Sequence, residues 1–331
     1  MFNVRLDSPE TATDYATLVA INNAAWPDRP GTVEEWMHDD KSWPTTHRFC
    51  RFVVEHAGRI IAEGAYMEPF WIKAPGKYYF GYSRLPEYEA KVIGGETVHD
   101  SVYRFLVEQL SPHPVSALLT SAREDKTFRV GWLEENGFTL TMRMPVSELN
   151  VETFDFAPYA GIQNRMAARG IHISSLQELQ SRDPDWLVKA HEMCMEIDKD
   201  VPSPDPPARQ PLEEFEKIFQ SPNFRADGWF IAEATTDVGE GVGPYVGVSM
   251  LGVSEATPEK MYTWLTGVLR PYRRKGLATA LKVSAIEFAG RHGAKVIQTD
   301  NEENNPMFQL NLALGFKPIP AWLTFEKQLG E

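Results

Sequence analysis

Cysteine is scarce in this chain of 331 residues, which contains only Cys50 and Cys194. The two lie far apart and match no spacing of metal ligands, so neither a disulfide framework nor a metal site is expected. Long apolar runs are missing as well: no stretch could span a bilayer, and the first residues contain no apolar signal core. We therefore expect a cytoplasmic protein with buried free thiols and no membrane partner.

Positive charge is in deficit. The chain contains 33 Lys and Arg residues against 46 Asp and Glu, which gives a formal net charge of −13. Proteins that bind nucleic acids concentrate positive charge on one face, so this balance argues against a nucleic-acid partner. One cationic run stands out from the acidic background, the segment RPYRRKGLATAL at 270–281. This segment is the first candidate for binding an anion.

The length favours two domains, and the two halves of the chain share one order of expected strands and helices. Tyr88 and Tyr272 differ by 184 positions, and the Gly-Phe pairs that begin at 137 and 315 differ by 178. Offsets that agree this closely favour a duplicated domain. We expect the first domain at 1–150, a linker at 151–170 and the second domain at 171–331.

The cationic run lies between an expected strand and an expected helix. The residues before it, KMYTWLTGVL at 260–269, are apolar and β-branched, as in a strand. After it, apolar residues recur at helical spacing from Leu277 to Phe288, and Gly293 follows as a stop signal. A basic turn that opens a helix is suited to an anion, because the first N–H groups of a helix are unpaired.

Residue size supports a phosphate site at this turn. Gly276 and Ala278 are small where the backbone has to approach a pyrophosphate, and Arg273, Arg274 and Lys275 add positive charge. A solvated basic turn before a core helix is the alternative interpretation, because R-x-x-G-x-A alone is a weak signal.

In this setting the pattern Arg273-x-x-Gly276-x-Ala278 resembles the acetyl-CoA signature R/Q-x-x-G-x-G/A of the GNAT superfamily of N-acetyltransferases. The resemblance covers roughly 171–327. The duplicated layout is similar to the tandem members of the superfamily, of which mycothiol synthase is one type. The resemblance implies an α+β fold with two tandem GNAT-like domains, each a mixed, mostly antiparallel central sheet flanked by helices.

The resemblance also implies acetyl-CoA as co-substrate. The main-chain amides of 274–279 would hold the pyrophosphate, and the end of the preceding strand would pair with the pantetheine arm. The implied cofactor-binding residues are Thr266, Val268, Leu269, Arg273, Arg274, Lys275, Gly276, Leu277, Ala278, Thr279 and Asn304. For Asn304, the N-cap of the helix that opens near Pro306 is an independent interpretation, and both roles are compatible.

The first half is expected to bind no cofactor. Alignment of LPEYEAKVIGG with the cationic run places Glu89 at the position of Arg273 and Val92 at that of Gly276. A carboxylate repels a pyrophosphate, and a β-branched side chain blocks a close approach of the backbone. One acetyl-CoA per chain is therefore expected.

The catalytic groups are less well indicated. Many members of the superfamily carry a tyrosine, the acid for the leaving thiolate, at the position that Asn311 occupies here. Asn311 cannot donate a proton in that way, although it could hydrogen-bond the sulfur. Main-chain N–H groups at a strand bulge near 266–268 are expected to polarise the thioester carbonyl.

Candidate contacts for the acceptor amine lie on two segments. Glu192, Glu196 and Asp198, with Asp200 beside them, form a cluster of carboxylates that could bind a cationic amine. Within this cluster, Glu196 and Asp198 are the candidate catalytic residues. A solvated helix face explains Glu192 and Glu196 as well. Tyr262 and Trp264 alternate on the strand before the bulge, where aromatics of the sheet surface or core are the alternative.

The sequence thus predicts an acetyl-CoA-dependent N-acetyltransferase that acts on a primary amine of a small molecule or peptide. A CoA-binding module without catalysis and a mycothiol synthase-like acetyltransferase are the alternatives. The acceptor, the length of the donor acyl group and the choice between monomer and homodimer stay open at this stage.

Overall fold

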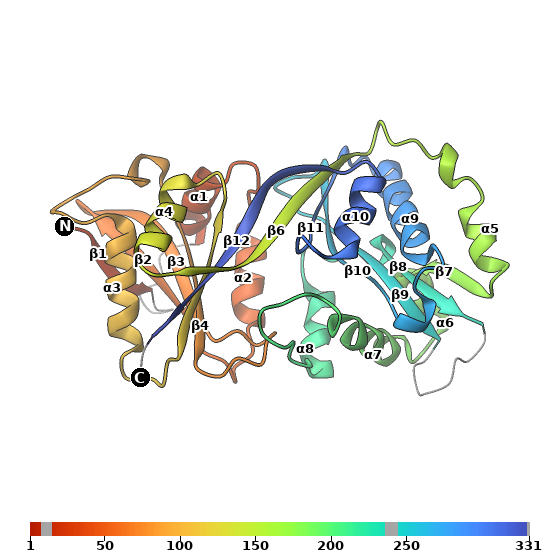
Figure 1. Ribbon diagram of the computed structural model, residues 1–331, viewed down its shortest axis with the longest axis horizontal. Helices are drawn as coiled ribbons and strands as arrows, with labels where there is room; N and C mark the ends of the chain where they lie inside the picture. The colour runs from red at the N-terminus through yellow and green to blue at the C-terminus, as the bar shows by residue number, and fades with distance from the viewer. Residues whose placement is uncertain (8–14, 236–243, 330–331) are drawn as a thin grey trace. The chain divides into compact units, whose positions relative to one another are not determined.

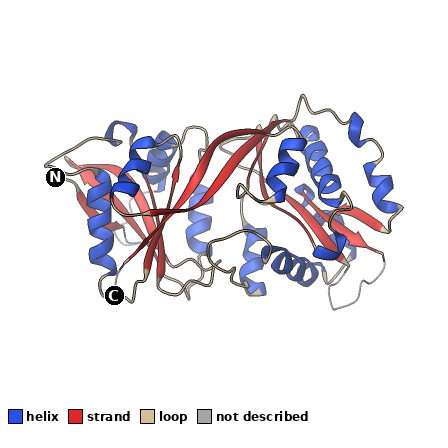
Figure 2. Ribbon diagram, in the orientation of Figure 1, coloured by secondary structure: helices blue, strands red, loops and turns tan. Residues whose placement is uncertain are grey.

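The computed structural model describes residues 1–7, 15–235 and 244–329. The chain divides into two compact units (Figures 1 and 2). Unit 1 comprises Met1–Met144, Pro204–Ala208 and Pro320–Glu331, and unit 2 comprises Pro145–Ser203 and Arg209–Ile319.

Unit 1 is built on a mixed sheet in the order β1-β2-β3-β4-β5-β12, in which only β4 and β5 run parallel. Its strands are β1 (Asn3–Asp7), β2 (Phe49–His56), β3 (Arg59–Met67), β4 (Lys77–Arg84), β5 (Ala117–Arg123) and the end of β12 (Lys317–Gln328). Its helices are α1 (Tyr15–Ala25), α2 (Val33–Ser42), α3 (Val98–Leu110) and α4 (Thr127–Glu135).

Unit 2 repeats this plan with the order β6-β11-β10-β9-β8-β7, and here β10 and β11 are the parallel pair. Its strands are the end of β6 (Thr139–Asn150), β7 (Ile171–Ser175), β8 (Trp229–Ala234), β9 (Tyr245–Gly252), β10 (Lys260–Val268) and β11 (Val296–Asp300). Its helices are α5 (Ile162–Ala167), α6 (Leu176–Arg182), α7 (Trp186–Asp198), α8 (Leu212–Glu216), α9 (Leu277–Arg291) and α10 (Pro306–Ala313). The expected fold, two mixed and mostly antiparallel sheets with flanking helices, is confirmed.

Each sheet contains a strand from the other half of the sequence. In unit 1, Trp322–Gln328 of β12 pairs with Ala117–Arg123 of β5, and in unit 2, Val146–Asn150 of β6 pairs with Val296–Asp300 of β11. On β12 the alternate residues Ala321, Leu323 and Phe325 are buried, which ties this strand to the core of unit 1. The two units therefore differ from the expected domains 1–150 and 171–331. The end of β6 belongs to unit 2, and the end of β12 belongs to unit 1.

Two further segments depart from the expected boundaries. The 204–208 segment belongs to unit 1, where Asp205 accepts hydrogen bonds of 2.9 Å from Nζ of Lys77. The expected linker 151–170 contains α5, which buries Ile162 and Met166 in the core of unit 2. An apolar helix face of only six residues is too short to stand out in the sequence pattern.

In unit 2, α7 and α9 cover opposite faces of the sheet (Figure 1). A Cβ added to Gly247 would lie 3.1 Å from Cδ1 of Leu281 on α9. A Cβ added to Gly267 would lie 2.2 Å from Cγ2 of Ile197 on α7. Because Val268 pairs with Gly247, the two share a face, and Gly267 points to the other side.

Cys50 and Cys194 are both free thiols. Cys194 is buried as expected, and its burial raises the pKa of the thiol, whereas Cys50 is partly exposed. Within the described ranges 1–7, 15–235 and 244–329, the helices are all too short or too polar to cross a membrane.

Candidate functional site

The site of unit 2 begins where β10 and β11 part. β10 pairs with β11 only over Lys260–Tyr262, although it continues to Val268. On its other edge β10 stays paired with β9, and the N–H of Leu269 donates to the carbonyl of Val246 at 2.9 Å. Main-chain groups of an antiparallel strand alternate in direction, so those of Thr266 and Val268 face the open edge.

The turn after β10 has a conformation that favours glycine. It runs from the short helix η5 (Arg270–Tyr272) through Arg274, with φ of 63°, to Gly276, with φ of 78°. α9 begins at the next residue, and its first main-chain hydrogen bond joins the N–H of Ala280 to the carbonyl of Gly276 at 3.0 Å. Among the described residues, no side chain caps the helix. The N–H groups of 276–279 therefore lack a partner within the described chain.

The space beside this turn is open. A Cβ added to Gly276 would meet no atom of the described residues within 4 Å, so a side chain there would enter open space. The positive φ at Gly276 thus favours glycine, and a larger residue would also occupy room that a ligand could use.

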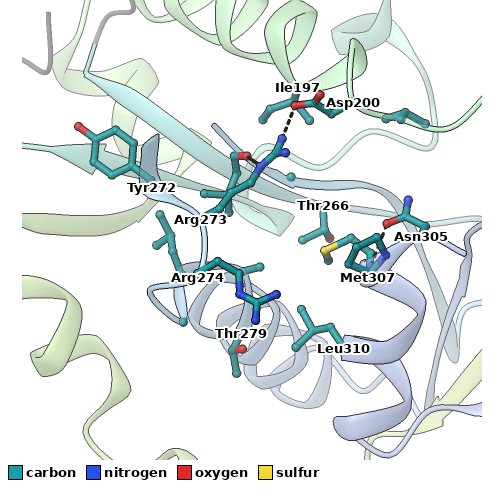
Figure 3. Close-up of a pocket in the computed structure, with 17 residues that line it drawn as sticks. Ile197, Asp200, Thr266, Tyr272, Arg273, Arg274, Thr279, Asn305, Met307 and Leu310 are labelled. Carbon is teal, nitrogen blue, oxygen red and sulfur yellow. Dashed lines mark hydrogen bonds and ion pairs between the residues drawn. The ribbon is translucent and has the colours of Figure 1, made fainter. Parts of the chain in front are cut away.

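A cavity of about 450 Å³ lies at this open edge (Figure 3). Four segments of unit 2 form its walls: the end of α7, the end of β10, the basic turn with the first residues of α9, and the start of α10. The lining residues are Ile197, Asp200, Val201, Thr266, Gly267, Val268, Tyr272, Arg273, Arg274, Gly276, Leu277, Ala278, Thr279, Asn305, Pro306, Met307 and Leu310.

The cations of the basic turn differ in whether their side chains are already bound to other groups of the protein. Asp200 forms ion pairs with Arg273 (Figure 3) and with Arg270. The hydrogen bond with Arg270 is the main reason that the pKa of Asp200 falls to about 2. Arg273 also donates from Nε to the carbonyl of Val268 at 2.8 Å, which links the turn to β10. Lys275 turns back to the carbonyl of Pro271 at 2.9 Å.

Arg274 differs from these cations. Its exposed side chain lines the cavity, and Figure 3 shows it extending along the start of α9 near Thr279. In the described part of the chain it has neither an ion pair nor a hydrogen bond from its guanidinium. It is therefore the cation of the turn that is free to meet an anion in the cavity.

The cavity brings together most of the expected cofactor-binding residues: Thr266, Val268, Arg273, Arg274, Gly276, Leu277, Ala278 and Thr279. Leu269 and Lys275 do not line it, since Leu269 is buried in the core and Lys275 turns back along the chain.

Asn304 is also outside the lining. Its exposed side chain donates to Glu302 at 2.8 Å, while the neighbouring Asn305 lines the cavity and caps α10 by accepting from the N–H of Met307 at 2.9 Å. The cap interpretation of Asn304 is therefore wrong by one residue. The preference of proline for the first helical position places the cap directly before Pro306 and would have identified Asn305.

Asn311 lies in the interior of unit 2. It is completely buried, donates from Nδ2 to Oδ1 of Asn301 at 2.6 Å and does not line the cavity. Its side chain is thus directed into the protein core, and its expected contact with a ligand sulfur stays a prediction.

Three of the four clustered carboxylates are already paired with cations. Glu192 pairs with Arg209, Glu196 with Lys199, and Asp200 with the two arginines of the turn. Asp198 has no hydrogen bond or ion pair in the described chain, and burial raises its pKa to about 6. Asp198 is not itself a lining residue, but its neighbours Ile197 and Asp200 are. The cluster thus leaves one carboxylate available for proton exchange.

The aromatic candidates lie on β10 before the cavity. Tyr262 shares a hydrogen bond of 3.1 Å with Thr257, and Trp264 contacts Trp229 edge to face at 5.9 Å between ring centroids. The β-bulge occurs at Trp264, since the register with β9 shifts between Thr263 and Leu265. The bulge expected near 266–268 therefore lies earlier, and neither aromatic lines the cavity.

Metal binding has no support in the described residues, where no three His, Cys, Asp or Glu side chains are placed to hold an ion. A phosphate-bearing ligand fits better: the uncapped start of α9, the free guanidinium of Arg274 and the open space at Gly276 face one cavity.

Residues 191–316 match the family model of the Acetyltransferase (GNAT) family. No curated protein has a significantly similar sequence.

Several solved structures are similar over the whole chain. A tandem GNAT protein from the clavulanic acid biosynthesis pathway, determined without AcCoA, has a TM-score of 0.71 at 15% identity, covering 100% of this chain and 99% of that one. The GCN5-related N-acetyltransferase from Sphaerobacter thermophilus has a TM-score of 0.65 at 16% identity, covering 99% and 95%. A glucosamine N-acetyltransferase region of a fungal multi-domain GH3 beta-N-acetylglucosaminidase has a TM-score of 0.68 at 12% identity, covering 99% and 38%.

At these identities the structural likeness concerns the fold, and the family match concerns the part of the chain that contains the cavity. Residues 191–316 therefore match the acetyltransferase (GNAT) family model, and the whole chain has a fold similar to that of a tandem GNAT protein.

Proposed function

We propose that unit 2 binds acetyl-CoA and transfers its acetyl group to a primary amine of a small molecule or peptide. The observation that carries this proposal is the start of α9, where the uncapped N–H groups of 276–279 and the free Arg274 face one cavity. A pyrophosphate matches this arrangement, because it can accept several hydrogen bonds and carries negative charge toward the positive end of a helix dipole.

The pantetheine arm would lie along the open edge of β10. The main-chain groups of Thr266 and Val268 face that edge, and an extended ligand can add to a strand by such groups. Met307 and Leu310 supply apolar contacts on the α10 side of the cavity. The residues that line the cavity thus fit both the charged and the extended part of CoA.

The bound co-substrate supplies a thioester, and the reaction exchanges its C–S bond for a C–N bond. The attacking amine must be neutral, so a group near the end of α7 has to accept its proton. We assign this role to Asp198, whose raised pKa of about 6 suits proton exchange near neutrality. The main-chain N–H of Thr266, on the open edge of β10, is the candidate to stabilise the developing oxyanion. The leaving thiolate takes a proton from solvent.

A CoA-binding module without catalysis is the second candidate. The buried Asn311 favours it, because the position where many superfamily members carry an acid holds an amide that points away from the cavity.

We include a cytoplasmic location in the first proposal, since Cys50 and Cys194 are unpaired thiols, as is usual in a reducing compartment.

Release of the CoA thiol from acetyl-CoA in the presence of a panel of primary amines separates the two candidates. Transfer predicts release that depends on the amine and an acetylated amine in equal amount. Tight binding of acetyl-CoA with no amine-dependent release favours the non-catalytic module. If acetyl-CoA does not bind at all, both candidates are wrong.

A further inference from the structure

Unit 1 contains a cavity of its own, of about 350 Å³. It is formed by the ends of α1 and β4, the residues after β4, and the start of α4. The lining residues are Ala25, Trp26, Ser83, Arg84, Pro86, Glu89, Asp125, Lys126, Thr127, Phe128 and Arg129. The proposed acetyl transfer in unit 2 makes no use of this cavity.

The cavity of unit 1 corresponds in the duplication to the cavity of unit 2, but arginines replace two apolar lining residues. The offset of 184 between Tyr88 and Tyr272 aligns Arg84 with Val268, and the offset of 178 between the Gly-Phe pairs aligns Arg129 with Met307. Each arginine thus stands where the cavity of unit 2 offers an aliphatic surface.

The start of α3 is not a second pyrophosphate site. α3 begins at Val98, so the connection from Tyr88 is longer than the one from Tyr272 to Leu277, and the alignment of Val92 with Gly276 does not hold. Thr97 and Asp100 form a capping box in which the Asp100 carboxylate accepts from the N–H of Thr97 at 2.7 Å. The positive end of α3 is therefore occupied by the carboxylate of the chain itself.

The two arginines of the cavity are buried and incompletely paired. Arg129 is 3% exposed and donates to the carbonyl of Tyr82 at 3.1 Å and to Oγ1 of Thr120 at 3.0 Å, both neutral groups. Arg84 is 6% exposed and forms an ion pair with Glu89. In the described structure the Nε atoms of both arginines are buried without a hydrogen-bond partner. Glu89 thus pairs with Arg84, whereas Arg129 forms no ion pair within the described residues.

Unpaired buried charge is costly, which is why buried arginines are usually matched by anions. The effect is visible at Arg84, where burial lowers the pKa of the guanidinium. The other carboxylate of the lining, Asp125, is bound to Arg123 at 2.7 Å, and Lys126 adds a further cation beside Trp26. Among the described residues, the lining of the cavity therefore has more cations than carboxylates available to pair with them.

The remaining walls are apolar and rigid. Trp26 is held by a hydrogen bond of 3.0 Å from Nε1 to Ser83 and by the guanidinium of Arg123 over its ring at 5.1 Å. Phe128, Pro86 and Ala25 complete the apolar surface. A ligand that fits these walls has an anionic head and a small apolar body.

We propose that unit 1 binds a small organic carboxylate in this cavity, with its head between Arg84 and Arg129 and its apolar body against Trp26 and Phe128. A planar carboxylate matches the fork of donors that a guanidinium presents. The volume of about 350 Å³ admits a ligand with one ring or a short chain.

Calorimetric titration of the full chain with benzoate, inorganic phosphate and free CoA tests the proposal. We expect benzoate to bind in the absence of CoA and to remain bound when unit 2 is saturated with CoA. Arg129→Gln should weaken benzoate binding by about tenfold or more, because it removes a charge-assisted contact. The matched control is Arg104→Gln, which alters an exposed arginine of α3 that pairs with Glu96.

Ala25→Leu is a second variant that tests benzoate binding if Arg129→Gln does not fold. It fills the cavity and leaves both arginines in place, so it should abolish benzoate binding while a thermal melt shows a folded protein. The proposal is overturned if benzoate does not bind, if it binds Ala25→Leu as well as the unaltered chain, or if phosphate competes equally well. Competition by CoA would assign benzoate to unit 2 and would overturn it too.

Discussion

Gly267 of β10 lies directly against Ile197 of α7: a Cβ at position 267 would be 2.2 Å from Cγ2 of Ile197. Real Cβ atoms do not approach another atom so closely. Ile197 is buried, and its branched side chain has little freedom to move away. Both residues line the cavity of unit 2, so this contact couples the position of α7 to the shape of the proposed acetyl-CoA site.

Gly267→Ala should therefore displace Ile197 and weaken both stability and ligand binding. We expect a loss of about 1–3 kcal/mol in the free energy of unfolding, as for other overpacked cores. Thermal denaturation and acetyl-CoA titration measure the two effects. Gly131→Ala is the control, since a Cβ at this glycine of α4 would meet nothing within 4 Å. Equal behaviour of the two variants would contradict the contact.

Arg274→Ala should weaken acetyl-CoA binding by about tenfold at low salt and by less at high salt, because it removes an exposed cation from the anion site. Arg291→Ala, at the other end of α9, removes the same charge and should leave the dissociation constant unchanged. Calorimetry at two ionic strengths measures both. A similar small effect of the two substitutions would show that Arg274 has no role in the site.

The pH profile of acetyl transfer tests the role of Asp198. Its carboxylate is the active form, so kcat/KM should rise with pH through about 6, the raised pKa of this group. Asp198→Asn should remove this acidic limb and lower kcat more than it raises KM. Glu196→Gln is the control, because Glu196 is already paired with Lys199. An unchanged limb in Asp198→Asn would exclude Asp198 as the base.

Lys282 should make unit 2 less stable near neutral pH than at alkaline pH. The residue is 4% exposed on α9, and burial lowers its pKa to about 7. The unfolded chain then binds more protons than the folded one between about pH 7 and the ordinary lysine value near 10.5, so stability rises with pH across this window.

Lys282→Met should remove this pH dependence and stabilise the protein at pH 7 by an amount on the order of a few kcal/mol. Chemical denaturation at pH 7 and at pH 10 measures both effects. The interpretation fails if the stability gain is as large at pH 10 as at pH 7, because the gain would then not come from the charge of the lysine.

The fold could be predicted because two observations agree: the duplication repeats the order of the expected strands and helices, and the resemblance to the GNAT superfamily implies a mixed, mostly antiparallel sheet in each half. Tyr88 and Tyr272, with the two Gly-Phe pairs, mark equivalent points, and the expected pair of mixed sheets is confirmed. The exchange of β6 and β12 could not be predicted in this way. Alternating residues show that a strand has a buried face, but they do not show which sheet it joins.

The candidate site, too, could be predicted only where it depends on residues that are close together in the sequence. Gly276 and Ala278 were identified by their size in a turn, a property that the sequence displays directly. The ion pairs of Asp200 with Arg270 and Arg273 join residues that are distant along the chain, so the sequence did not reveal which cations they neutralise. The roles of the lining residues in binding and catalysis stay predictions.

The most direct test of the central claim is a calorimetric titration of acetyl-CoA into Gly276→Val, with Gly293→Val as control. Both glycines have positive φ, of 78° and 79°, and open space at the Cβ position, but Gly293 follows the far end of α9. The two variants therefore carry the same backbone strain, and circular dichroism checks that each is folded. We predict one acetyl-CoA per chain for the unaltered protein and for Gly293→Val, and none for Gly276→Val. Undiminished binding by a folded Gly276→Val, or two equivalent sites in the unaltered chain, would contradict the account.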